Sequence, residues 1–229
     1  MTRFRRMIFA ALLAGSFSGL VLFAVQHVTI VPLITVAEGF EEAAELQAGH
    51  AHDDTAWEPS PGLQRTALTA ITTMLSGIGF AAILLGCMAV NGRAVDARRG
   101  LLWGLAGFAC FVLAPALGMP PRPPGAAVGD LPLRQLWWLG TVIATAAGLW
   151  LILGRAGPWW TRPLGVVAMA LPHLLGAPAP SGPDAVPPEL MRDFGMLSVA
   201  TNLVFWTVLG LLCGRLLERH AGDPDAAPA

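Results

Sequence analysis

A series of long apolar runs with almost no charged residue constrains this chain more than any other feature. A transmembrane helix needs about 20 such residues to cross roughly 30 Å of hydrocarbon, at 1.5 Å per residue. Six segments qualify as candidates: 7–26, 67–90, 100–118, 136–153, 164–176 and 194–217. We therefore predict an all-α polytopic transmembrane helix bundle with six spans, or with five if the short segment 164–176 is re-entrant.

The placement of arginine predicts the orientation, because basic residues are retained on the cytoplasmic side of a membrane. With a cytoplasmic N-terminus and six spans, four arginines lie in outer segments: Arg65, Arg122, Arg134 and Arg192. The other ten lie in inner segments: Arg3, Arg5, Arg6, Arg93, Arg98, Arg99, Arg155, Arg162, Arg215 and Arg219. With five spans, Arg215 and Arg219 would lie on the outer side instead. Eleven of the fifteen acids fall in the outer segments.

Composition excludes several function classes. Of the 229 residues, 55% are hydrophobic, 13% are charged and none is lysine, so the chain lacks the lysine of an ATP-binding P-loop or of a pyridoxal Schiff base. A net charge of −1 without a basic run gives no reason to expect nucleic-acid binding. Cys87, Cys110 and Cys213 have no C-x-x-C spacing, and we expect them to be small buried hydrophobes. We expect neither an enzyme nor a resident cofactor.

We predict one integral-membrane domain over 1–220, followed by a short disordered tail at 221–229. An acidic, histidine-containing outer loop spans 37–65, and Pro- and Gly-rich outer loops begin at Met119 and Ala177. G-x-x-x-G spacing at Gly15/Gly19, Gly100/Gly104 and Gly210/Gly214 predicts close helix packing. Tryptophans near the predicted span ends are typical of interface anchors; they are Trp137, Trp138, Trp159, Trp160 and Trp206.

The outer loop carries the densest set of metal-ligand side chains. Glu38, Glu41, Glu42 and Glu45 would form an acidic face on a helix that prolongs the first span. His50, His52, Asp53 and Asp54 follow, and two imidazoles with two carboxylates can supply most of the shell of a divalent first-row metal. The alternative is a solvated acidic loop whose histidines bind nothing.

Two further histidines are candidate ligands. His173 lies inside the apolar segment 164–176, where an ionisable side chain usually faces a cavity or the bundle interior. Pro172, Gly176 and Pro178 would loosen the helix and free backbone carbonyls around it. The alternative is a neutral imidazole bonded to a neighbouring helix. His27 at the outer end of the first span is a weaker candidate, since interfacial histidines are often only anchors.

Several passages, in order along nearly the whole chain, resemble the CbtA family of proposed cobalt transporter subunits. They cover 10–34, W-x-P-x-x-G-L-x-R-T at 57–66, 96–120, 134–149, and LPHLLGAP at 171–178. The resemblance implies a bacterial or archaeal cytoplasmic (inner) membrane protein that takes up cobalt for cobalamin synthesis. It also implies a small single-span, His-rich partner, CbtB, and usually five spans. It does not indicate which residues bind metal.

Our leading hypothesis is a subunit of a cobalt(II) transporter, in which the outer loop captures the cation and passes it to a site between helices near His173. The alternative is a membrane scaffold that assembles a partner transporter, because the predicted spans carry almost no ionisable side chain apart from His173. An intramembrane enzyme ranks last, since no set of acid, base and nucleophile is visible.

Overall fold

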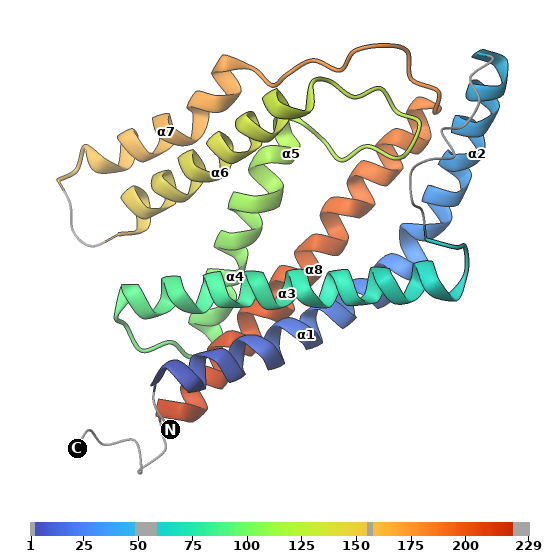
Figure 1. The fold of residues 1–229 in the computed structure, drawn as a ribbon. Coiled ribbons are helices and arrows are strands. Elements are labelled where there is room, and N and C mark those ends of the chain that lie inside the picture. The colour runs from blue at the N-terminus through green and yellow to red at the C-terminus, as the bar shows by residue number, and fades with distance from the viewer. Residues whose placement is uncertain (1–2, 49–58, 155–157, 222–229) are drawn as a thin grey trace. The chain divides into compact units, whose positions relative to one another are not determined.

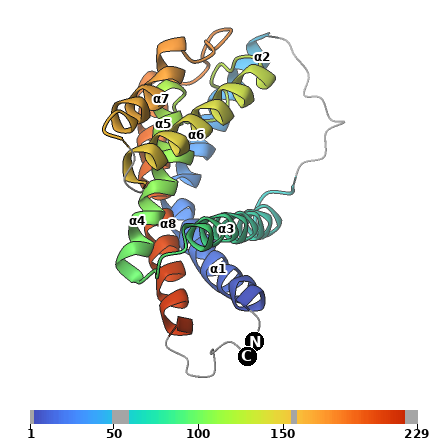
Figure 2. The same ribbon diagram turned by 90° about the vertical axis from the view of Figure 1, so that its left-hand side faces the viewer.

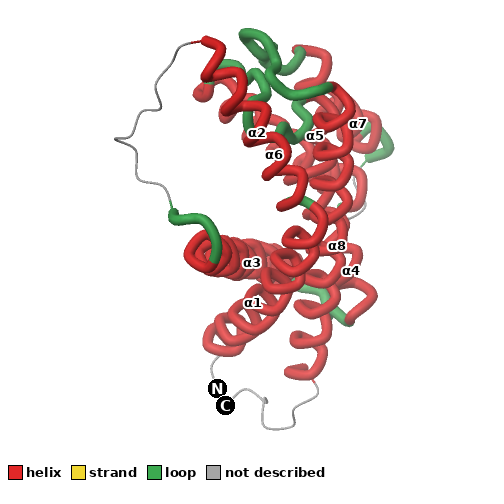
Figure 3. The backbone as a smooth tube through the Cα atoms, turned by 90° about the vertical axis from the view of Figure 1, so that its right-hand side faces the viewer, coloured by secondary structure: helices red, strands yellow, loops and turns green. Residues whose placement is uncertain are grey.

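The computed structural model describes residues 3–48, 59–154 and 158–221, and within these ranges every regular element is a helix (Figures 1 and 3). The elements are α1 (Arg3–Thr29), α2 (Val31–Ala48), α3 (Leu63–Asn91), α4 (Ala97–Phe108), the π-helical turn η1 (Ala109–Leu113), α5 (Ala114–Gly118), α6 (Leu131–Leu153), α7 (Thr161–Leu175) and α8 (Pro188–Ala221). The prediction of an all-α chain is confirmed for these residues.

Five helices of the described chain are long and apolar enough to cross a membrane. They are Phe4–Thr29, Leu63–Asn91, Ala97–Gly118, Leu131–Leu153 and Pro188–Arg219. The remaining predicted span corresponds to α7, whose 15 residues rise only about 22 Å. A sixth span is therefore not confirmed, and the cytoplasmic N-terminus stays a prediction.

A proline explains the π-helical turn in the third of these spans. Pro115 has no N–H, and in a regular α-helix its ring would collide with the carbonyl of the residue four positions earlier. The helix widens just before this proline, so that the N–H of Ala114 bonds to the carbonyl of Ala109, five residues back. The segment 97–118 consequently continues as one helical span through α4, η1 and α5.

The chain divides into two compact units. The first comprises residues 1–28, 53–107 and 201–229, and it contains most of α1, α3, most of α4 and the C-terminal part of α8. The second comprises residues 29–52 and 108–200, and it contains α2, η1, α5, α6, α7 and the N-terminal part of α8.

Glycines set the packing of the first unit, as their spacing predicts. A Cβ on Gly15 would lie 2.6 Å from the carbonyl carbon of Gly77 in α3, and one on Gly100 would lie 2.7 Å from Cα of Gly214 in α8. Both distances are far below normal van der Waals contact, so the helix backbones approach as closely as only glycine allows.

Aromatic packing completes this first core. The Phe80 ring in α3 lies 5.0 Å from the Trp206 ring in α8, and Trp206 is buried. The prediction that Trp206 is an interface anchor is therefore wrong, since its ring fills the space above Gly107. Cys110 and Cys213 are buried as predicted, whereas Cys87 is exposed.

The second unit is built around a hairpin of α6 and α7, which lie side by side and antiparallel (Figures 1 and 2). Their closest approach is again made by glycines, because a Cβ on Gly148 would lie 2.6 Å from the carbonyl oxygen of Gly165. His173 and the residues around it lie on this hairpin, at the end of α5 and in the loops that follow α5 and α7.

Candidate functional site

His173 lies in the last turn of α7, half-buried, against an aromatic ring of the neighbouring helix. Its imidazole and the Trp137 ring of α6 meet edge to face, with centroids 5.8 Å apart and planes at 77°. Edge-to-face contacts of this kind hold both rings in defined orientations. The histidine of α7 therefore has a fixed neighbour at the end of the hairpin where α6 begins and α7 stops.

Three helices position Trp137 itself. Its indole N–H donates to the carbonyl oxygen of Pro172 at 3.1 Å, and its own carbonyl accepts from the Thr141 hydroxyl at 2.8 Å. A Cβ on Gly118, the last residue of α5, would lie 2.5 Å from the indole ring. Trp137 consequently packs against the end of α5 and links that end to the histidine on α7.

The end of α7 differs partly from the prediction that prolines and a glycine loosen the helix and free backbone carbonyls around His173. The helix continues through Pro172 to Leu175 and stops at Gly176, whose φ of +85° is costly for any other residue. The Gly176 N–H bonds to the carbonyl oxygens of Pro172 and His173, each at 3.2 Å. These two carbonyls are therefore bonded rather than freed. The Ala168 carbonyl does lose its regular helical donor, because Pro172, four residues later, has no N–H.

The two Pro- and Gly-rich loops are joined to each other. Arg122 pairs with Asp184 at 3.1 Å, and the same carboxylate oxygen accepts the N–H of Ala127 at 2.9 Å. The Ala185 N–H donates to the Gly125 carbonyl oxygen at 3.0 Å. The loop after α5 and the loop after α7 thus form one hydrogen-bonded cap at one end of the second unit.

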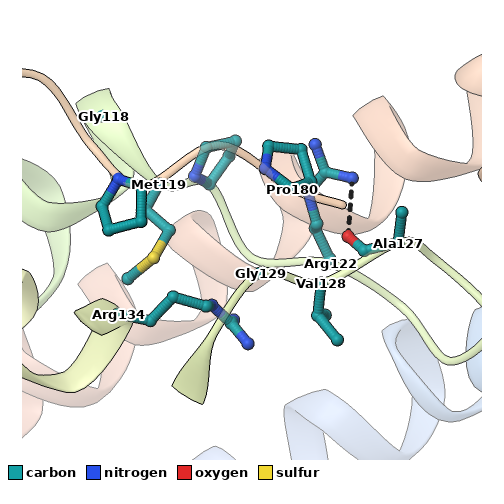
Figure 4. A pocket seen from close by; sticks show the side chains of 10 residues that line it. Gly118, Met119, Arg122, Ala127, Val128, Gly129, Arg134 and Pro180 are labelled. Atoms are coloured by element: carbon teal, nitrogen blue, oxygen red, sulfur yellow. Dashed lines mark hydrogen bonds between the residues drawn. The ribbon is translucent and has the colours of Figure 1, made fainter. Parts of the chain in front are cut away.

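A small pocket opens beneath this cap (Figure 4). Its volume is about 40 Å³, and its lining includes Met119, Arg122, Val128, Arg134, Pro178 and Pro180. That volume suits a few water molecules or one small ion, whereas organic ligands occupy pockets of roughly 300 Å³ or more.

The charges of the pocket do not favour a cation. Arg122 is balanced by Asp184, and it also donates to the Ala127 carbonyl oxygen at 3.1 Å. The guanidinium of Arg134, in the first turn of α6, makes no hydrogen bond or ion pair within the described parts of the chain, whereas its backbone N–H bonds the Asp130 carbonyl oxygen at 3.1 Å. Since a half-buried guanidinium repels a divalent metal, we place no metal in this pocket.

The acidic helix α2 packs on the same cap. The predicted acidic helix is confirmed over Val31–Ala48, which makes 37–48 helical rather than loop. Glu41 lies against Gly125, where a Cβ on the glycine would come within 3.0 Å of the glutamate Cβ. Glu38 and Glu45 are half-buried on the same face, and Glu42 is exposed. The second unit therefore carries three glutamates on one face of α2, one of them against the loop after α5, and His173 at the end of α7.

The structure tests the predicted ligand set only in part. His50, His52, Asp53 and Asp54 lie outside the described residues. His27 is exposed near the end of α1, 5.6 Å from the Phe23 ring, and belongs to the first unit. Within the described ranges, no three His, Cys, Asp or Glu side chains gather as a metal site. The assignment of metal to these six residues stays a prediction.

Sequence reasoning missed the contacts that hold this region together. Trp137 was expected only at the membrane interface, yet it contacts His173 and bonds the backbone of α7. Arg122 and Asp184 are 62 residues apart, so no local pattern could have paired them. The buried hydroxyl of Thr145 in α6 also went unnoticed, since threonine is ordinary in an apolar helix.

Comparison with known proteins gives one match. The model of the family described as "Probable cobalt transporter subunit (CbtA)" matches residues 4–218. No curated protein and no solved structure matches the chain. The family match covers the second compact unit, the first except its residues 1–3 and 219–229, and all five candidate spans except the final residue of the last.

Proposed function

We propose that this chain, which belongs to the CbtA family of probable cobalt transporter subunits, takes up cobalt(II) across the cytoplasmic membrane of a bacterium or archaeon and supplies cobalamin synthesis. In this proposal, an acidic outer surface gathers the cation and passes it to His173. The observation that carries the proposal is the presence of His173 and the acidic helix α2 in one compact unit of a cobalt-transporter family member.

The chemistry of His173 supports a role as a ligand for a late first-row metal. Imidazole nitrogen is a preferred ligand of cobalt, nickel, copper and zinc. Trp137 fixes the ring on one edge, and the residue is only partly buried. A histidine held in this way loses less conformational entropy when it binds an ion than a free one does.

Glutamates supply the capture surface. Glu38, Glu41 and Glu45 share one face of α2, and the sequence continues directly into His50, His52, Asp53 and Asp54. Clustered negative charge raises the local concentration of cations and their rate of association. We propose that the histidines and aspartates take the cation from this surface.

The topology that we propose has six crossings and a cytoplasmic N-terminus. Bonds between Arg122 and Asp184 and between Gly125 and Ala185 support it, because they hold the loops after α5 and α7 on one side of the membrane. A chain that leaves this side through α6 must then return through α7. A helix of 15 residues can make that return where the bilayer thins locally or the flanking loops enter the interface.

The energy source in this proposal is the membrane potential or an ion gradient, since the chain has no lysine for a P-loop. Inward movement of one charge through 100 mV provides about 2.3 kcal/mol, and a divalent cation gains twice that amount. A single-span, His-rich membrane protein is the partner that we propose, in line with the description of the family as a subunit.

Uptake of radioactive cobalt tests this function in cells that lack their own high-affinity importers. We expect His173→Ala and the double variant His50→Ala/His52→Ala to lose most uptake at matched membrane levels. His220→Ala is the matched control, because this histidine lies at the C-terminal end of α8 and far from the predicted ligands in sequence. Equal uptake by all variants would show that these histidines are not on the route.

A second candidate function is a scaffold for a partner transporter. It is favoured by the scarcity of charge in the five candidate spans, each of which carries an 18-residue window with at most two charged residues. In that case the chain expressed alone moves no cobalt, whereas co-expression with the His-rich partner restores uptake that is insensitive to His173→Ala. The same uptake assay distinguishes the two functions.

A further inference from the structure

The pocket beneath the cap contains a guanidinium group without a counter-charge. Arg134 is partly buried, and its side chain makes no hydrogen bond or ion pair within the described parts of the chain. Arginine carries five N–H donors and stays charged at physiological pH, so a partly buried guanidinium normally has an oxygen partner. We therefore looked for the acceptor that this group would bind.

A second arginine of the same pocket also has unused donors. Arg122 uses only its Nη1 atom, which bonds the Asp184 carboxylate and the Ala127 carbonyl oxygen at 3.1 Å each. Its Nε and Nη2 groups bond nothing among the described residues. Because Asp184 balances Arg122, the charge of Arg134 is the one left uncompensated at the pocket.

The rest of the pocket supplies no acceptor of its own to these donors. The other described lining residues are glycine, proline, alanine, valine and methionine, so no carboxylate lines the pocket. The carbonyl oxygens of Ala127 and Val128 already accept side-chain hydrogen bonds within the cap. Asp130, the acid nearest to Arg134 in sequence, is exposed and caps α6 by accepting the Leu133 N–H. The chemistry of the pocket therefore fits an anion.

The wall beside Arg134 is held by close packing of the two loops. A Cβ on Gly129 would lie 2.6 Å from the Ala179 carbonyl oxygen, so the loops cross there as closely as only glycine allows. Arg134 extends from α6 past this glycine, and its Cδ atom would lie 3.9 Å from the same Cβ (Figure 4). A side chain that is positioned in advance loses less entropy when it binds a ligand.

The pocket lies where two candidate membrane spans end. The span Ala97–Gly118 stops at Gly118, which lines the pocket, and the span Leu131–Leu153 begins three residues before Arg134. Lipid headgroups lie just beyond the hydrocarbon that such spans cross. Long arginine side chains near the ends of spans extend toward these headgroups. Phosphate groups are therefore the anions that are most abundant at this level of the membrane.

We propose that this pocket holds the phosphate group of an anionic membrane lipid, with the Arg134 guanidinium as its charged donor. A guanidinium matches the oxygens of phosphate in geometry, and basic pockets between membrane spans bind lipid headgroups. The pocket, of about 40 Å³ and partly open, admits one small charged group and leaves the rest of the lipid outside. The single charge of a phosphodiester also matches the one uncompensated arginine.

Binding of radioactive phosphatidylglycerol to the purified, delipidated full-length chain in detergent micelles tests the site. We expect saturable binding to the unaltered chain. Arg134→Met should weaken it at least about tenfold, which corresponds to the loss of one charge-assisted interaction. Saturable binding that is absent from the unaltered chain, or equal affinity in Arg134→Met, would overturn the site.

A second variant should strengthen lipid binding, which damage to the fold cannot do. Asp184→Asn keeps the oxygen that accepts from Arg122 and Ala127, but it removes the charge that balances Arg122. We expect this variant to bind phosphatidylglycerol more tightly, by up to about fivefold. Weaker binding in Asp184→Asn would contradict the electrostatic basis of the site.

Arg192→Met is the matched control, since this arginine belongs to the same unit and does not line the pocket. Its side chain is 67% exposed and pairs with Asp193, so its loss should leave lipid binding unchanged. An equal loss of affinity in Arg192→Met and Arg134→Met would mean that lipid is attracted by overall charge, and it would overturn the site. Thermal melting of every variant shows whether it remains folded.

Competition experiments identify the source of the phosphate group. Millimolar inorganic phosphate should not displace the lipid, because acyl chains hold the headgroup at the ends of the spans. Displacement would assign the pocket to free phosphate and overturn the lipid assignment. Phosphatidylcholine should compete more weakly than phosphatidylglycerol, since its choline cation offsets the phosphate charge, and equal competition would refute the preference for an anionic lipid.

The lipid site does not rest on the proposed transport of cobalt. Phosphatidylglycerol binding that is lost in Arg134→Met, in a chain that moves no cobalt with or without a partner, would refute the transport function and leave this site standing.

Discussion

The indole N–H of Trp137 donates to the carbonyl oxygen of Pro172, 35 residues away along the chain, at a distance of 3.1 Å. This bond joins α6 to α7 at the residue that precedes His173. The tryptophan ring then meets the imidazole edge to face. One side chain therefore fixes both the backbone that carries the candidate ligand and one edge of its ring.

Replacement of Trp137 by phenylalanine tests this relationship, because it keeps an aromatic ring and removes the N–H. We expect a loss of about 0.5–1.5 kcal/mol in the free energy of unfolding, the usual net contribution of one hydrogen bond. Half-maximal cobalt uptake should also require a higher cobalt concentration, since His173 is less constrained. The control is Trp150→Phe on the same helix, where the side chain is 57% exposed.

A methyl group at Gly100 should disrupt the first unit. The Cβ of Gly100→Ala would lie 2.7 Å from Cα of Gly214, so α4 and α8 must separate. We expect a cost of about 1–3 kcal/mol, measured by reversible unfolding in mixed micelles. Gly79→Ala on α3 has no atom within 4 Å of its new Cβ and should be neutral. Equal stability of the two variants would contradict the packing described here.

The ion pair between Arg122 and Asp184 should protect the loop amides from exchange. Arg122→Met removes the pair and the bond to the Ala127 carbonyl, while a side chain of similar length remains. Both partners are partly exposed, so we expect a stability change of only about 0.2–1 kcal/mol. The informative measurement is hydrogen–deuterium exchange of the Ala127 and Ala185 amides, which should become faster.

Arg192→Met serves as the control for this exchange experiment. Arg192 pairs only with its sequence neighbour Asp193 among the interactions described, and 67% of its side chain is exposed. Its replacement should leave both loop amides unchanged. Unaltered exchange in Arg122→Met would mean that the remaining bonds, those from Ala127 to the Asp184 carboxylate and from Ala185 to Gly125, hold the cap together without the ion pair.

Labelling with a membrane-impermeant maleimide tests the six-crossing topology. In a variant without the three native cysteines, single cysteines are placed at Ala126, Ser181 and Ala94. We expect Ala126→Cys and Ser181→Cys to react from outside intact cells, because hydrogen bonds join their two loops. Ala94→Cys should react only after permeabilisation. Labelling of Ser181→Cys from the inside would exclude a return of the chain through α7.

The sequence predicted the helical spans well, for a physical reason. In hydrocarbon every backbone N–H and C=O must be bonded within its own segment, so a long apolar run has little choice but to form a helix. Five of the six predicted segments lie within candidate spans in the described chain. Glycine spacing likewise predicted close packing, because only glycine permits the approach seen between Gly15 and Gly77.

The partners of these helices could not be predicted. Nothing local distinguishes Trp206, which is buried beside Phe80, from the tryptophans at span ends, because burial depends on which helix lies opposite. Exposure of Cys87 follows from the same cause: its side of α3 has no facing helix within the described unit. Apolar residues face lipid and protein alike, so hydropathy carries no signal for the difference.

By itself, the sequence determined the fold class, five candidate spans, the glycine spacing that allows close packing and the residue types able to bind metal, since these depend on local composition and spacing. Tertiary structure alone decided that Trp137 supports His173 and that Arg122 meets Asp184. Each of these relationships joins segments distant in sequence. Their geometry is fixed by how the helices pack, and periodicity within one helix does not specify which partner packs against it.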